Sequence, residues 1–154
     1  MRVRFDINEI IKATGAHHPS RDEAGRMPAS VSGVSIDSRT AEPGDMFVAL
    51  KGNRFDGHDY IAEAFSRGVL LAIVSEQWLG SEKRAAGPEP LLGARDTLAA
   101  FQELGKYHRI RTNPKVVAVT GSSGKTTTKD MIASVSSTCY RTAKTQGNPN
   151  NQFG

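Results

Sequence analysis

Apolar residues in the first 110 positions recur in turn at helical and at strand spacing. Ile7, Ile10 and Ile11 fall on one helical face. Asp6 stands where a helix cap is expected, and Gly15 is a stop signal. Other apolar runs, bounded by glycine, proline and polar residues, predict strands. The pattern predicts helices over 7–14, 59–67 and 97–109, strands over 31–36, 46–50 and 69–74, and loops over 16–30 and 79–90.

The pattern changes after the helix breaker at residues 111–114. Residues 116–120 form a continuous apolar run that predicts a buried strand, and a glycine-rich turn follows it. We then expect a helix over 126–137 and a strand over 139–143. The fold class is therefore α/β. Residues 1–111 are expected to form a small mixed α/β domain, and residues 112–154 the opening strand, phosphate loop, helix and strand of a parallel-sheet domain.

The turn after residue 120 has the composition of a phosphate cradle. Gly121 and Gly124 permit a tight turn that brings backbone N–H groups close to an anion, and the next helix points its positive end there. Lys125 supplies a mobile cation, and the Thr126 hydroxyl is suited to Mg²⁺. The strict motif wants glycine where Val119 stands, so a plain polar turn is the alternative. We expect a nucleoside triphosphate with Mg²⁺.

The amino-acid composition indicates the kind of ligand and the cellular compartment. The 154 residues carry a formal net charge of +4, which suits an anionic small ligand, and no basic cluster alternates with aromatic residues as nucleic-acid binding requires. Cys139 is the single cysteine, so no intrachain disulfide forms, and we expect it to be a small apolar residue at the start of a strand. No secretory signal or membrane-length apolar segment is evident, which indicates a cytoplasmic protein.

The second predicted domain looks incomplete. Beyond Lys125 the single carboxylate is Asp130, one turn into the helix that leaves the loop, which is the wrong element for a metal ligand. Two strands and one helix also bury too little apolar surface for a stable sheet. We therefore expect the chain to be a fragment of a longer protein, or to be completed by a partner.

Residues 116–130, VVAVTGSSGKTTTKD, resemble the ATP loop of the Mur ligases of peptidoglycan synthesis. Residues 35–39, 43–52 and 55–61 resemble the UDP-binding domain of that family. Residues 145–154, TQGNPNNQFG, resemble a loop of the member that joins D-alanyl-D-alanine to UDP-N-acetylmuramoyl-tripeptide. The resemblance covers nearly the whole chain.

The resemblance implies an ATP-dependent amide ligase. A substrate carboxylate would attack the γ-phosphate of ATP to give an acyl phosphate, which the amine of D-alanyl-D-alanine would then attack. The cofactors implied are ATP and Mg²⁺. The chain would supply the UDP-binding domain and the opening of the ATP-binding domain, and we expect it to be unable to turn over alone.

The resemblance also assigns residues. It implies Lys125 as the catalytic cation and Thr126 as the metal ligand. The ATP-binding residues would be Gly121, Ser122, Ser123, Gly124, Lys125, Thr126 and Thr127. The residues that bind the UDP-linked substrate would be Ser35, Asp37, Ser38, Arg39, Gly52, Arg54, Asn148, Asn150 and Asn151.

Plainer explanations exist for several of these residues. Residues 37–39 are also consistent with a local salt bridge and a turn, and the asparagines with a turn-rich loop. His58 is expected to be a hydrogen-bonded loop anchor, and His17 with His18 a solvated pair.

Other functions stay open as well. The chain could be a non-enzymatic nucleotide-binding module completed by a partner. It could also be a sister Mur ligase that adds a single amino acid, or a folylpolyglutamate synthetase, although residues 145–154 argue against both.

Overall fold

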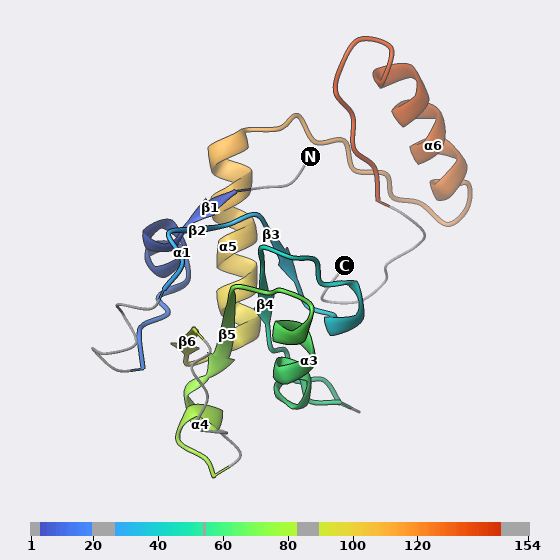
Figure 1. Ribbon diagram of the computed structural model, residues 1–154. Coiled ribbons are helices and arrows are strands. Elements are labelled where there is room, and N and C mark those ends of the chain that lie inside the picture. The colour runs from blue at the N-terminus through green and yellow to red at the C-terminus, as the bar shows by residue number, and fades with distance from the viewer. Residues whose placement is uncertain (1–3, 20–26, 54, 83–89, 146–154) are drawn as a thin grey trace. The chain divides into compact units, whose positions relative to one another are not determined.

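The computed structural model divides into two compact units, Met1–Asn113 and Pro114–Gly154. It describes residues 4–19, 27–53, 55–82 and 90–145 (Figure 1). Within these ranges no helix has both the length and the apolar character needed to cross a membrane.

A four-stranded parallel sheet forms the centre of the first unit and confirms the α/β fold class. Its strands lie in sequence order: β3 (Gly33–Ser35), β4 (Asp45–Val48), β5 (Leu71–Ser75) and β6 (Leu91–Ala94). Parallel neighbours need crossover connections. These contain the 3₁₀ turn η1 (Ser38–Thr40), the 3₁₀ turn η2 (Gly57–Tyr60) with α3 (Ile61–Ser66), and α4 (Glu76–Leu79).

The two longer helices of this unit, α1 (Ile7–Thr14) and α5 (Thr97–Thr112), begin at aspartate caps. Asp6 accepts a hydrogen bond from the Asn8 N–H (2.8 Å) and donates its own N–H to the Glu9 carboxylate (3.1 Å), which confirms a capping box. Gly15 ends α1 in the left-handed conformation, with φ of 67°. Asp96 caps α5 as the sequence predicts.

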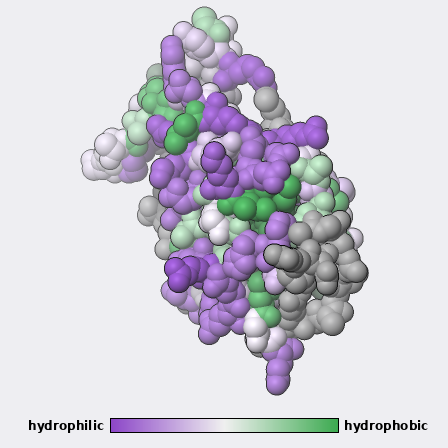
Figure 2. All heavy atoms as spheres, turned by 90° about the vertical axis from the view of Figure 1, so that its left-hand side faces the viewer, coloured by the Kyte–Doolittle hydropathy of each residue, from purple (hydrophilic) through white to green (hydrophobic). Residues whose placement is uncertain are grey.

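Both faces of the central strands are buried. On one face Phe47 and Val74 pack with Ile61 of α3. The alternating residues Met46 and Ile73 are fully buried toward the other face, because successive side chains of a strand point in opposite directions. There α5 lies against β5, and α1 packs on α5 (Figure 1). Since the apolar side chains are mostly inside, the face in Figure 2 is largely hydrophilic.

Several predicted elements of the first unit need correction. The expected strand over 31–36 is divided: β2 (Ser30–Val31) pairs antiparallel with β1 (Phe5–Asp6), and β3 belongs to the parallel sheet. The helix expected over 59–67 begins as η2, and α5 continues to Thr112. Neither α4 nor β6 was expected, because α4 is barely one helical turn long and Gly93 interrupts the short apolar run of β6.

The second unit contains α6 (Lys125–Ser136), close to the helix expected over 126–137. The strands expected at 116–120 and 139–143 are wrong, since the structure assigns neither. Val116 and Val117 are 56% and 67% exposed. A strand forms only where a neighbour accepts its hydrogen bonds, and the described part of this unit offers none. Cys139 is accordingly exposed in the turn after α6 instead of starting a strand.

Candidate functional site

The phosphate loop of the second unit folds as a glycine turn directly before α6. Gly121 and Gly124 have φ of 152° and 75°, backbone conformations that residues with a Cβ rarely adopt. Gly124 is the N-cap of α6, and the first regular helical bond runs from the Thr128 N–H to its carbonyl (2.9 Å). The turn therefore delivers the chain to the helix as the glycine spacing predicts.

Lys125 folds back over this turn. Its Nζ donates a hydrogen bond to the Gly121 carbonyl oxygen at 2.7 Å. Ser122, Ser123 and Thr126 lie beside it and are exposed, so the loop is open to solvent. The lysine ammonium is thus held against the first residue of the glycine turn.

The start of α6 fits a phosphate group. No side chain caps this helix, whereas α1 and α5 have aspartate caps. The first N–H groups of a helix have no partner within it, and together with the helix dipole they attract anions. A Cβ added at Gly124 would meet no atom within 4 Å, so space is also available.

Near the phosphate loop, the residues available to bind a metal ion are fewer than those available to bind phosphate. Thr126 is exposed in the first turn of α6, where its hydroxyl is accessible. Asp130 pairs instead with Lys144 (2.8 Å), whose hydrogen bond holds the pKa of this carboxyl below its ordinary value. Among the described residues no group of three histidine, cysteine or carboxylate side chains could hold a metal ion.

Four of the predicted substrate residues cluster at the carboxyl end of β3. The Ser35 hydroxyl donates to the Asp37 carbonyl (2.9 Å), and the buried Ser38 donates to Glu63 of α3 (3.0 Å). Arg39 binds the Asp37 carboxylate through Nε (2.9 Å) and Nη2 (2.7 Å). This guanidinium lowers the pKa of Asp37, and the pair matches the salt bridge and turn named as the plainer explanation.

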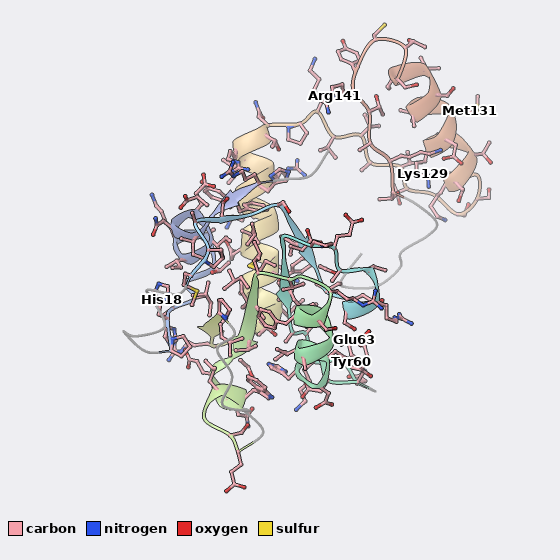
Figure 3. All side chains as sticks on the ribbon, in the orientation of Figure 1. His18, Tyr60, Glu63, Lys129, Met131 and Arg141 are labelled. Carbon is pink, nitrogen blue, oxygen red and sulfur yellow. The ribbon has the colours of Figure 1, made fainter. Side chains whose placement is uncertain are left out.

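Glu63 is the residue of this edge that the sequence did not single out. It lies on α3 near Tyr60, as Figure 3 shows, and reaches Arg67 (3.6 Å) as well as Ser38. Its contact with Ser38 joins residues 25 positions apart, for which the sequence carries no local signal.

Gly52 follows β4 and therefore lies at the same sheet edge as the residues that follow β3. Its N–H donates to the Phe55 carbonyl (2.9 Å), and a Cβ at this position would come 2.7 Å from the Phe55 ring. The remaining predicted substrate residues, Arg54, Asn148, Asn150 and Asn151, lie outside the described residues.

His58 is a buried anchor of the loop after β4, as expected. Its Nε2 accepts a hydrogen bond from the Ser75 N–H (3.0 Å), so the proton must be on Nδ1, which faces the Asp56 carboxylate. The ring also stacks on Trp78. By contrast, His17 is tied by its backbone to Gly93, and its ring lies 3.8 Å from Glu76.

Two family models match the chain. "Mur ligase family, catalytic domain" matches residues 30–104, and "Mur ligase middle domain" matches residues 119–154. The second range includes the phosphate loop and the whole of α6.

Individual proteins agree with these matches. The UDP-N-acetylmuramoyl-tripeptide–D-alanyl-D-alanine ligase of Bacillus subtilis is 39% identical over 153 residues, which are 99% of this chain and 31% of that protein. A crystal structure of MurF from Acinetobacter baumannii superposes with a TM-score of 0.80 at 35% identity, over 99% of this chain and 32% of that one.

A third protein carries a nucleotide. The crystal structure of MurF ligase from Thermotoga maritima in complex with ADP superposes with a TM-score of 0.58 at 32% identity, covering 88% of this chain and 29% of that one. The chain thus spans about a third of the length of the relatives it matches.

Proposed function

This chain belongs to the Mur ligase family, and we propose that the protein containing it joins D-alanyl-D-alanine to UDP-N-acetylmuramoyl-tripeptide at the expense of ATP. The observation that carries this proposal is the 39% identity, over 99% of the chain, to the Bacillus subtilis ligase of that name. The uncapped start of α6 behind two left-handed glycines supports the ATP half of it.

The proposal assigns a task to each part of the chain. Residues 1–111 bind the UDP-linked substrate, and residues 112–154 form the first part of the ATP-binding domain. Because the proposed substrates are a UDP-linked precursor and ATP, we place the protein in the cytoplasm, where nucleotide-activated substrates and ATP are available.

At the phosphate loop the chain supplies positioning and charge. Lys125 exchanges the Gly121 carbonyl for the terminal phosphates of ATP, and its charge stabilises the transfer of the γ-phosphoryl group to the substrate carboxylate. Residues 121–124 and the N–H groups of Lys125, Thr126 and Thr127 hold the remaining phosphates. Thr126 is the ligand for Mg²⁺, which neutralises phosphate charge when bound.

At the sheet edge the residues after β3 bind the diphosphate and uridine. The Arg39 side chain is 79% exposed, and water and salt weaken an exposed ion pair. A diphosphate therefore competes easily with Asp37 for this guanidinium, so the observed salt bridge and substrate binding are compatible. Ser35 and Ser38 shape the loop, with Gly52 on the neighbouring strand end. We assign Arg54 and the three asparagines to the same substrate from the resemblance.

A ligation assay on the full-length protein tests this function. Wild type should join D-alanyl-D-alanine to the UDP-tripeptide and release ADP. Lys125→Met should lower the rate at least about a hundredfold, since the transferred charge loses its cation. Lys115→Met removes a nearby positive charge outside the loop and should retain most of the rate. Joining of a single amino acid in place of the dipeptide would refute the proposal.

A further inference from the structure

Side chains at the end of α3 connect this helix to η1, the turn that contains Arg39. Ser38, the first residue of η1, donates its hydroxyl proton to the Glu63 carboxylate at 3.0 Å. The carbonyl oxygen of Arg39 accepts a hydrogen bond from Arg67 Nη1 at 3.1 Å. Glu63 and Arg67 stand four positions apart and pair with each other at 3.6 Å. Two consecutive residues of η1 are therefore connected to one linked pair of side chains.

The helix that supplies this pair is anchored in the core. Ile61 and Ala64, on either side of Glu63, are buried in the cluster that covers one face of the sheet. Figure 3 shows Glu63 on this helix, which packs beside η1. By contrast, η1 has three residues and is shaped locally by Asp37, whose carboxylate accepts from the Arg39 N–H at 3.0 Å. The contacts from α3 thus set the position of this short turn relative to the sheet.

These contacts do not depend on the Arg39 guanidinium. They reach the Ser38 hydroxyl and the Arg39 backbone, whereas the guanidinium binds the Asp37 carboxylate. When a diphosphate takes the place of Asp37, the contacts to α3 can therefore persist. The Cα atom of Arg39 keeps its place while its side chain changes partner.

We propose that Glu63 is a positioning residue for the UDP-linked substrate, because it holds η1 where Arg39 presents its guanidinium at the carboxyl end of β3. This inference rests on the proposed function, of which it uses the assignment of residues 35–39 to this substrate. A carboxylate repels a diphosphate, so Glu63 does not bind the substrate itself. It acts through Ser38 and, by way of Arg67, through the Arg39 carbonyl.

Steady-state kinetics of the full-length ligase test this role. Glu63→Ala should raise the KM for UDP-N-acetylmuramoyl-tripeptide about tenfold, equal to about 1.4 kcal/mol. The KM for ATP should change by less than about threefold, since the phosphate loop belongs to the second unit. Glu63→Gln keeps an acceptor for the Ser38 hydroxyl and should restore most of the lost affinity. Glu103→Ala removes a carboxylate from another exposed helical ion pair, that with Lys106 on α5, and should resemble wild type.

A double-mutant cycle tests whether Glu63 acts through Ser38. The variant that combines Ser38→Ala with Glu63→Ala should raise the KM for the UDP-linked substrate by less than the product of the two single effects, since each change removes the same hydrogen bond. A KM equal to that product would overturn the proposed route.

Hydrogen exchange of the Arg39 and Thr40 amides provides a readout that is independent of turnover. Exchange should be faster in Glu63→Ala than in Glu103→Ala, because η1 loses its contact with α3. The inference is overturned if these two variants match in either KM or exchange, or if Glu63→Ala raises both KM values equally. A wild-type protein that neither binds nor ligates the UDP-linked substrate would instead overturn the proposed function, whereas normal ligation beside an unaffected Glu63→Ala would overturn this inference alone.

Discussion

At the scale of single residues, the loop after β4 depends on one buried imidazole. His58 connects the carboxyl end of β5, through the Ser75 N–H, to Asp56 at the start of η2. Burial acts to raise the pKa of Asp56, but hydrogen bonds from the His58 ring and backbone outweigh it, so this pKa lies below its ordinary value of 3.8. The contacts of His58 with Ser75 and Asp56 therefore connect the loop after β4, which carries Gly52, to the end of β5.

The lowered pKa of Asp56 predicts a pH-dependent stability. A carboxyl with a depressed pKa contributes its full stability above the unfolded value of 3.8, and loses it as the pH falls through the lower folded value. Asp56→Asn should therefore lower the free energy of unfolding by about 1 kcal/mol at pH 6, with the difference shrinking as the pH falls below 3.8. Urea unfolding of the chain at several pH values measures this.

Asp59 offers a matched control for this experiment. It lies three positions further along the same 3₁₀ turn, and its side chain is exposed. Asp59→Asn should follow the wild-type curve throughout. Equal pH profiles for Asp56→Asn and wild type would show that the His58 contact does not stabilise the fold.

At the scale of elements, local chemistry predicted helix starts well, whereas of the expected strands 46–50 and 69–74 formed as β4 and β5 and 116–120 and 139–143 did not form. Asp6 and Asp96 cap their helices as their positions indicate, because capping involves only the next three residues. Strands depend on distant partners instead. The apolar run 116–120 predicted a strand, yet it pairs with no neighbour in the part of the chain that the structure describes, whereas the short β6 forms because β5 lies beside it.

The candidate site shows the same division. The phosphate loop could be predicted, since its glycines, its lysine and the following helix are consecutive in sequence. The contact of Ser38 with Glu63 and that of Lys129 with Thr145 could not, because each joins segments that only folding brings together.

Alanine substitutions at two glycines, Gly57 and Gly105, test the packing around these positions. Gly57 begins η2, and a Cβ there would come 2.7 Å from the backbone N and O of Leu50, atoms that cannot move aside easily. Gly57→Ala should destabilise the chain by about 2 kcal/mol. Gly105 is exposed within α5 with nothing within 4 Å, and Gly105→Ala should stabilise it by about 0.5–1 kcal/mol. Thermal or urea unfolding compares both with wild type, and changes of the same sign would contradict the packing described.

At the scale of the whole molecule, the two units differ in charge and in packing. Residues 114–154 contain five basic residues and one acidic residue, a net charge of +4 that equals the total for the chain, so the first 113 residues are neutral overall. Of the large apolar side chains exposed by more than 40%, the second unit contributes Val116, Val117, Met131, Val135 and Tyr140. The first unit, by contrast, buries both faces of its sheet.

The difference in packing between the two units leads to different binding expectations for a ligase and for a nucleotide-binding module without catalytic activity. A ligase of the proposed kind recognises the UDP-linked substrate through the well-packed first unit. The phosphate loop, with no strand neighbour in the described chain, is then the weaker binder here. A module completed by a partner would bind the nucleotide and ignore the UDP-linked compound.

Calorimetric titration of the 154-residue chain with UDP-N-acetylmuramoyl-tripeptide, and in parallel with ATP and Mg²⁺, tests the central claim most directly. We expect saturable binding of the UDP-linked substrate, weakened by Arg39→Met, and weak or undetectable binding of ATP with Mg²⁺. Tight binding of ATP with Mg²⁺, and no heat from the UDP-linked substrate, would contradict the ligase account and favour the module.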